Sequence, residues 1–184
     1  AERYHLHRWS VRFLVAVGVW NFLGAGVFGF LINLPVVSYY EIGTALTANH
    51  AHTAMMGVYG MLAAGLLLFC LRYLTQPDKW SDRAAKISFW SLNIGLTWMA
   101  FFNLFPLGLV QLYHSVETGY WHARSLDFLM LPWINLLEWA RLPGDTLFIV
   151  GGALPLVWLC WRALRFPNPR ITPAEAELPR PLRL

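Results

Sequence analysis

Two histidines separated by one alanine are the residues best able to carry chemistry in this sequence. His50 and His52 stand in the run TANHAHT (47–53), near the start of a long apolar stretch. Ionisable side chains are costly inside a membrane and usually mark functional sites there. Imidazole nitrogens also bind heme iron and other transition metals. The pair therefore predicts a metal or cofactor site.

Helix geometry limits how this pair can bind. Successive residues of an α-helix are turned by about 100°, so positions i and i+2 point about 200° apart. His50 and His52 would leave opposite faces and could not chelate one ion together. A zinc site on one helix would instead use histidines four residues apart, or cysteine partners. Two hemes, one on each side of the helix, fit the spacing. The alternative is that both rings only hydrogen-bond to neighbouring helices.

Small residues would let flat macrocycles approach the helix that carries the pair. They are Ala51, Ala54, Gly57 and Gly60. In the first apolar stretch, a second set of small residues is expected to allow close helix packing rather than to form a ligand loop. This set is Gly18, Gly24, Gly26 and Gly29. Buried amides are expected to bridge helices by hydrogen bonds. They are Asn21, Asn33, Asn93, Asn103 and Gln111.

The composition indicates that these residues belong to a membrane protein. Of 184 residues, 57% are hydrophobic and 13% are charged, and the mean hydropathy is +0.46, too apolar for a soluble domain of this length. A bilayer core of about 30 Å requires about 20 apolar helical residues. Four stretches meet this requirement, at about 11–34, 46–73, 85–112 and 144–166. The sequence predicts an all-α, polytopic transmembrane bundle of four spans over residues 1–166.

The segments between and after the spans are more polar. Residues 113–143 mix tryptophans with charges, which predicts an outer interfacial segment with an amphipathic helix. Residues 167–184 contain five prolines and scattered charges, which predicts a disordered cytoplasmic tail. The chain starts with Ala1 rather than Met and shows no cleavage site, so we expect a fragment of a longer protein.

The basic residues predict the orientation. Of the 14 Lys and Arg residues, only Arg124 and Arg141 fall on the side opposite the termini. Basic loops stay on the cytoplasmic side, so both termini are expected to be cytoplasmic and the histidine pair to lie near the outer face. The net charge of +4 therefore does not indicate a nucleic-acid partner. Cys70 and Cys160 are expected to remain reduced thiols.

Three runs carry a family resemblance: GAGVFGF (24–30), YEIGTALT (40–47) and NHAHTAMMGVYG (49–60). They resemble the C-terminal part of bacterial nitric oxide reductase large subunits, in the heme-copper oxidase superfamily, and the likeness extends to about residue 166. The later stretches 111–125 and 143–146 look more like the quinol-dependent branch than the cytochrome c-dependent branch.

The resemblance implies a function and roles for the two histidines. His50 would be the proximal ligand of a high-spin catalytic heme, and His52 an axial ligand of a low-spin heme, both of b type. The ligands of a non-heme iron would lie in upstream helices outside this chain. The enzyme would reduce two nitric oxide molecules to nitrous oxide and water in the respiratory chain of denitrification. It would act in the bacterial cytoplasmic (inner) membrane, with quinol or cytochrome c as donor, and only together with the remainder of the catalytic subunit. Its other partners would be membrane lipids.

Asp145 has two interpretations. It precedes the fourth apolar span, where it or a neighbour could cap the start of a helix. It also lies near Trp139 at the outer interface, where it could accept a hydrogen bond and a proton from a quinol. The other histidines are expected to be solvated rather than to bind metal. They are His5, His7, His114 and His122.

Two other functions stay open at this stage. One is an oxygen-reducing heme-copper oxidase, whose distinguishing residues would lie outside this chain. The other is a non-catalytic heme-binding membrane partner subunit, in which the Gly-rich and Trp-rich faces stabilise a complex.

Overall fold

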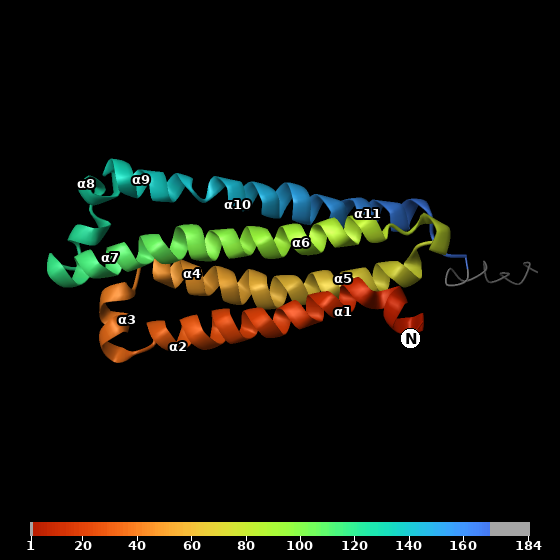
Figure 1. Cartoon of the computed structure of the whole chain (residues 1–184), viewed down its shortest axis with the longest axis horizontal. Helices are drawn as coiled ribbons and strands as arrows, with labels where there is room; N and C mark the ends of the chain where they lie inside the picture. Colours follow the sequence, from red (N-terminus) through yellow and green to blue (C-terminus); the bar gives the residue numbers. More distant parts are fainter. Residues whose placement is uncertain (1, 170–184) are drawn as a thin grey trace, which may run out of the picture.

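The computed structural model describes residues 2–169, with side chains from residue 5 onward, and four long helices dominate it. They are His5–Ile32, Ala45–Leu74, Asp82–Glu117 and Pro132–Arg165, and each is long and apolar enough to cross a membrane. Figure 1 shows them side by side, with the chain reversing direction from each helix to the next. The predicted all-α bundle of four spans is confirmed.

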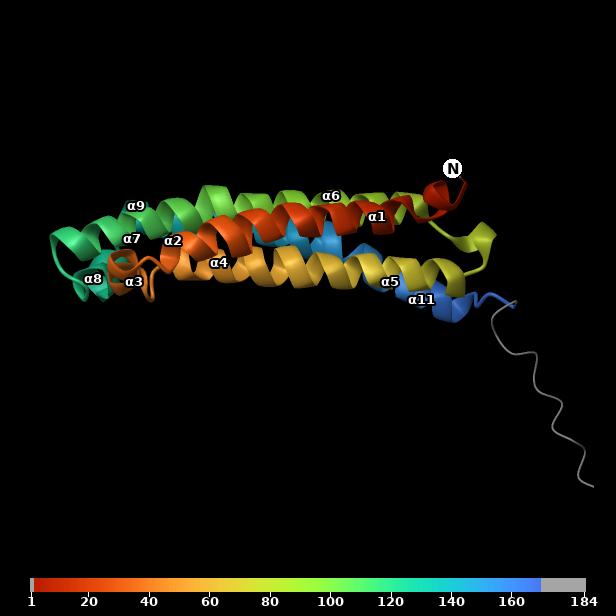
Figure 2. The same ribbon diagram turned by 90° about the horizontal axis from the view of Figure 1, so that it is seen from below.

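Each long helix consists of several segments. The first contains α1 (Glu2–Trp20), η1 (Asn21–Phe28) and α2 (Gly29–Ile32); the second contains α4 (Ala45–Ala54), η2 (Met55–Gly60) and α5 (Met61–Leu74). The third contains α6 (Asp82–Trp98), η4 (Met99–Leu104) and α7 (Phe105–Glu117); the fourth contains α9 (Pro132–Trp139), α10 (Leu142–Thr146), η6 (Leu147–Ala153) and α11 (Leu154–Arg165). Short helices connect them: α3 (Pro35–Glu41), η3 (Pro77–Lys79), η5 (His122–Arg124) and α8 (Leu126–Leu129). Figure 2 shows that the spans do not lie in one plane, since α1 and α6 lie toward one side and α5 and α11 toward the other.

The helices extend beyond the predicted apolar stretches. The third continues to Glu117, and the fourth begins at Pro132, so the predicted interfacial segment 113–143 is divided between two spans and a short loop. Hydropathy identifies only the part of a helix that lies in the apolar core of the membrane, whereas the helix itself can continue into the polar interface. Proline suits the first turn of a helix, where its missing N–H would be unpaired anyway. Residues 170–184 of the predicted tail lie outside the described residues.

A π-helical segment of six to eight residues interrupts each of the four long helices. In the third and fourth helices a proline follows two residues later, at Pro106 and Pro155. A proline ring clashes with the carbonyl four residues earlier, and a wider turn relieves that clash. The segments η1 and η2 instead contain glycines that meet neighbouring helices. Proline and close helix contacts thus account for the departures from α geometry.

One apolar cluster unites all four spans. Its most buried members include Phe13 of α1, Met61 and Leu68 of α5, Leu96 of α6 and Leu159 of α11. Lipid is as apolar as these side chains, so close packing and hydrogen bonds, rather than escape from water, hold the helices together.

Buried polar groups add specific links between spans. Trp20 Nε1 donates to Asn93 Oδ1 at 2.9 Å, Ser88 Oγ donates to the Gly152 carbonyl at 2.8 Å, and the Ala45 N–H donates to Gln111 Oε1 at 2.7 Å. Asn103 Nδ2 also donates to the Leu137 carbonyl of the fourth span, so the predicted bridging role is confirmed for Asn93, Asn103 and Gln111. Asn33 departs from it, because its amide donates to Gly29 within its own span.

Arg124 holds the loops at the opposite end of the bundle from the chain's start. Its guanidinium donates to the carbonyls of Tyr40 and Ile42, between the first and second spans, and also to Ser115 Oγ and the Tyr120 carbonyl. The charged group lies 3.6 Å from the Tyr120 ring centroid. One side chain therefore joins the connection before α4 to the end of the third helix.

Replacing Arg124 with methionine is expected to loosen this end of the protein. Methionine keeps much of the side-chain volume but donates no hydrogen bond, so several carbonyls lose their partner, at a stability loss of about 1–3 kcal/mol. Thermal unfolding in detergent should show a lower Tm. Lys79→Met, which removes a basic residue from a solvent-exposed turn, provides the control. Equal melting of the two variants would contradict the proposed clamp.

Candidate heme-binding site

The two histidines on α4 face different neighbours. His50 lies against the first span, with Nδ1 2.8 Å from the Gly24 carbonyl oxygen of η1. His52 places Nδ1 2.8 Å from the carbonyl oxygen of Ala48, one turn earlier on α4, and its Nε2 faces the fourth span. The two rings thus leave opposite sides of the helix, as their spacing predicts.

The hydrogen bonds fix which nitrogen of each ring is protonated. A carbonyl oxygen can only accept, so each Nδ1 must carry the hydrogen and donate it. Each Nε2 is then left with a lone pair. A histidine that binds a metal through one nitrogen usually donates its other N–H in this way, which orients the ring and makes it a stronger ligand. Both imidazoles could therefore bind a metal through Nε2.

Two glycines form the slot that holds the His50 ring. A Cβ added to Gly24 would lie 2.6 Å from the carbonyl carbon of Thr53, and one added to Gly29 would lie 2.9 Å from His50 Cε1. The predicted close packing is thus confirmed at both positions. It is wrong at Gly18, where nothing lies within 4 Å, and at Gly26, whose Cβ would meet only the Asn21 carbonyl at 3.5 Å.

The expectation that Gly57 leaves room for a macrocycle is also wrong. Trp20 covers it, because a Cβ added there would lie 2.6 Å from the Cβ of Trp20. An indole cannot be recognised as the neighbour of a particular glycine from sequence, since the contact depends on the register between two spans. Gly60, in contrast, lines an open cavity.

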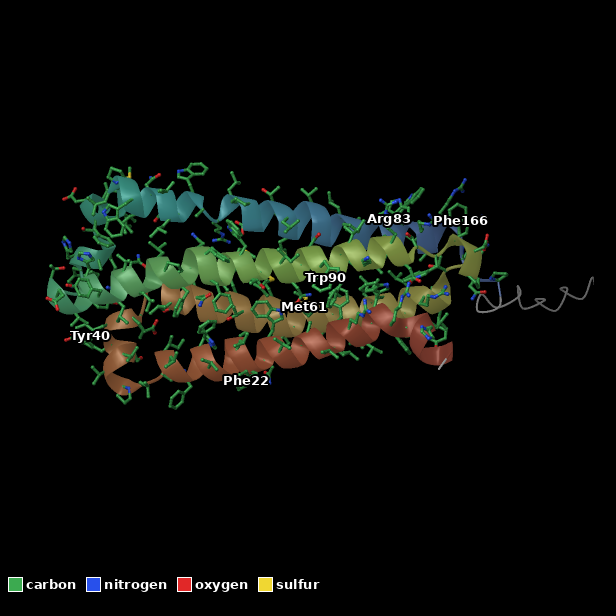
Figure 3. All side chains as sticks on the ribbon, viewed as in Figure 1. Phe22, Tyr40, Met61, Arg83, Trp90 and Phe166 are labelled. Carbon is green, nitrogen blue, oxygen red and sulfur yellow. The ribbon has the colours of Figure 1, made fainter. Side chains whose placement is uncertain are left out.

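On the other side of α4, the His52 side chain lies at an apolar groove between the second and fourth spans. A cavity of about 250 Å³ contains His52, Met56, Arg141 and Phe148 in its wall. It adjoins a second cavity of about 430 Å³, lined by apolar residues and by Gly60, and the two share Met56 and Phe148. In Figure 3, Met61, which also lines the second cavity, lies near the middle of the bundle. The groove thus runs from His52 toward the centre of the bundle.

Arg141 and Asp145 form the polar end of this groove. Arg141 Nε donates to Asp145 Oδ2 at 2.7 Å, while the buried Asp145 Oδ1 has no hydrogen-bond partner. Asp145 lies inside α10, whose N-cap is Arg141 without a side-chain cap. The interpretation of Asp145 as a helix cap is therefore wrong, because the helix begins before it. Sequence reasoning did not identify Arg141 as a site residue, since nothing in its local sequence shows that it lies beside His52.

These features fit a heme at His52, and at His50 they leave an Nε2 lone pair that could bind iron. Each Nε2 can bind iron, and the groove offers an apolar wall with a cation at one end, which suits a flat apolar ring with acidic groups. Arg141 Nη2 lies 3.3 Å from His52 Nε2 and donates to the same lone pair that iron would use. For His52 to bind iron, Arg141 would therefore have to turn to another acceptor. In residues 5–169, no group of three or more His, Cys, Asp or Glu side chains could together hold a metal ion.

Two of the remaining histidines are packed rather than solvated. His7 lies 4.7 Å from the Phe69 ring centroid, and His114 lies 4.9 Å from that of Phe128. Both are partly buried, so the prediction of simple solvation is wrong for them. His122 is exposed and also lies against Phe128, at 5.6 Å. Helix ends in this bundle are covered by aromatic side chains, which local sequence does not reveal.

Comparisons with known proteins give two findings. Residues 1–147 match the family described as cytochrome c and quinol oxidase polypeptide I. A relative from Stutzerimonas stutzeri, named as a subunit of nitric oxide reductase, is 32% identical over 155 residues. The alignment covers 82% of this chain and 32% of the relative, so the chain spans about a third of that protein's length.

Proposed function

Because this chain belongs to the family of cytochrome c and quinol oxidase polypeptide I, we propose that it is part of the catalytic subunit of a respiratory nitric oxide reductase. The observation that carries the proposal is the pair of imidazoles on α4, on opposite sides of the helix, each oriented through Nδ1 by a backbone carbonyl so that Nε2 keeps a lone pair. The similarity to the nitric oxide reductase of Stutzerimonas stutzeri supports nitric oxide as the substrate.

In this proposal each histidine holds one b-type heme. His50 binds the iron of the high-spin heme, and His52 binds the iron of the low-spin heme. A bound heme supplies an iron centre that accepts and passes on single electrons. The chain's own part is to hold the rings rigidly, through Gly24 and Ala48, on one helix with only Ala51 between them. The remainder of the catalytic subunit supplies the other ligands, including those of a non-heme iron.

The overall reaction combines two nitric oxide molecules, two electrons and two protons to give nitrous oxide and water. The family description also names oxidases, which keeps oxygen reduction as a second candidate. The full-length protein, supplied with a reduced donor, should produce nitrous oxide from nitric oxide much faster than it consumes oxygen. Rapid oxygen uptake without nitrous oxide formation would instead establish the oxidase.

We further propose that quinol is the donor and that Asp145 receives one of its protons. The buried Oδ1 has no partner, while Arg141 holds Oδ2, so one carboxylate oxygen is available to a hydroxyl group. A quinol gives up two electrons and two protons when it becomes a quinone. A positioned carboxylate that accepts one of these protons acts as a general base.

Asp145→Asn is expected to slow quinol oxidation much more than the later steps of turnover. The amide cannot take up a proton, so turnover with quinol should fall by about 100-fold, the lower end of what general-base catalysis contributes. Turnover with an artificial one-electron donor should change far less. Glu138→Gln, which alters a nearby carboxylate on α9, serves as the control. A similar fall with both donors would show that Asp145 maintains the structure and does not bind quinol.

The basic residues support a location in the bacterial cytoplasmic membrane with both termini in the cytoplasm. In residues 5–169, Arg124 and Arg141 lie at one end of the bundle, and all other Lys and Arg residues lie at the end that contains the start of α1 and the end of α11. Such an excess of basic residues is characteristic of the cytoplasmic side.

A further inference from the structure

A surface groove runs between the third and fourth spans at the basic end of the bundle. Its volume is about 380 Å³, and its wall includes Arg83 and Ile87 on α6 and Val150, Leu154 and Trp158 on the fourth span. In Figure 3, Arg83 and Phe166 lie toward the same end of the bundle. The groove is distinct from the cavities near His52, with which it shares no lining residue.

The groove is polar at one end and apolar along its length. Arg83 and Ser81 lie at the start of the third helix. The other wall is apolar from Val150 to Trp158, which are eight positions apart and so about 12 Å apart along the helix axis at 1.5 Å per residue. An amphipathic molecule with a charged head and a narrow apolar tail matches this arrangement.

Positive charge is in excess among the described residues at this end of the bundle. Within residues 5–169, the acidic side chains here are Asp78 and Asp82, and both are paired, Asp78 with Lys79 at 3.0 Å and Asp82 with Arg8 at 2.9 Å. Arg83 is exposed, and the described part of the chain gives it no carboxylate partner. Among the described residues, the head of a molecule in the groove would therefore meet a positive charge with no unpaired carboxylate beside it.

We propose that this groove binds one anionic phospholipid, with its phosphate on Arg83 and an acyl chain along Ile87, Leu154 and Val150. Trp158 lies near the charged end, and tryptophan prefers the level of the lipid head groups. Basic residues near the membrane surface attract anionic lipids. A zwitterionic lipid would gain less, because residues 5–169 offer its cationic group no unpaired carboxylate here.

Native mass spectrometry of the full-length protein in detergent tests this proposal. Phosphatidylglycerol and phosphatidylcholine with identical acyl chains are titrated separately. The protein should retain one more molecule of phosphatidylglycerol than of phosphatidylcholine. Phosphatidylglycerol should bind the groove about fivefold more tightly, the factor expected from one basic residue at the surface. Arg83→Gln should remove this preference, and Leu154→Trp, which fills the groove, should remove binding of both lipids there.

Lys79→Gln is the matched control, because it removes a basic residue at the same end outside the groove. An equal effect of Arg83→Gln and Lys79→Gln would indicate diffuse surface charge and overturn the proposal. Equal retention of the two lipids by the unaltered protein would overturn it as well. Circular dichroism and thermal unfolding establish that each variant is folded. The result does not depend on heme content, so it is independent of the proposed catalytic function.

Discussion

Alanine at His50 or at His52 is expected to remove one heme from the full-length protein, and a different heme in each variant. The two rings leave opposite sides of α4, one toward the first span and one toward the fourth, so neither can replace the other. A pyridine hemochrome assay should give about half the heme content of the unaltered protein in each case. Visible spectra should lose the high-spin bands in His50→Ala and the low-spin bands in His52→Ala, because each histidine serves one iron.

His114→Ala provides the control for this pair of variants. His114 is also partly buried but packs against Phe128, far along the chain from α4, and should leave both hemes in place. Full heme content in both His50→Ala and His52→Ala would contradict the proposal. The chain would then be better described as a non-catalytic membrane subunit whose histidines hold helices together.

Gly24→Ala is expected to weaken the site without touching either histidine. Its new methyl group would lie 2.6 Å from the Thr53 carbonyl carbon and 2.8 Å from the Thr53 carbonyl oxygen. Backbone atoms cannot move aside as a flexible side chain can, so η1 and α4 must separate. Overpacking of this kind reduces stability by about 1–3 kcal/mol. The separation should also stretch the hydrogen bond from His50 Nδ1 to the Gly24 carbonyl.

Gly18→Ala is the control for the effect of Gly24→Ala on thermal unfolding. It is the same substitution in the same helix, but its Cβ meets nothing within 4 Å, so it should change stability little. Thermal unfolding should therefore separate the two variants, and visible spectra should show a disturbed high-spin heme only in Gly24→Ala. Normal stability and spectra in Gly24→Ala would mean that the two spans can move apart without disturbing His50.

The sequence predicts the bundle well because a membrane imposes a simple requirement. A helix that crosses lipid must be apolar over most of its length and must satisfy its own backbone, so hydropathy identifies it. The placement of His50 and His52 on opposite faces follows in the same way from the angle between helical residues. The ends of the helices are less predictable, as the extension to Glu117 and the start at Pro132 show. Residues at the membrane interface can form either helix or loop, so hydropathy does not show where a helix ends.

The partners of the site depend on contacts between spans that are distant in sequence. Arg141 lies 89 residues from His52, and Gly24 lies 26 residues from His50. No local pattern in the sequence links these residues, because each contact requires the relative height and rotation of two helices. Asp145 illustrates the same difficulty. Its sequence context favours a helix cap, yet the chain is already helical before it, and its side chain turns to Arg141.

The π-helical segment η2 determines which face of α5 lies on the same side of the second span as His52. His52 precedes η2 and Ala64 and Leu67 follow it, yet His52 adjoins the same groove that these two residues line. Loss of one residue from 55–60 would turn everything after it by about 100° relative to His52. Ala64 and Leu67 would then leave the groove although neither residue had been replaced. Proteins that share this groove are therefore expected to vary in its side chains but to keep the length of chain between His52 and Leu67.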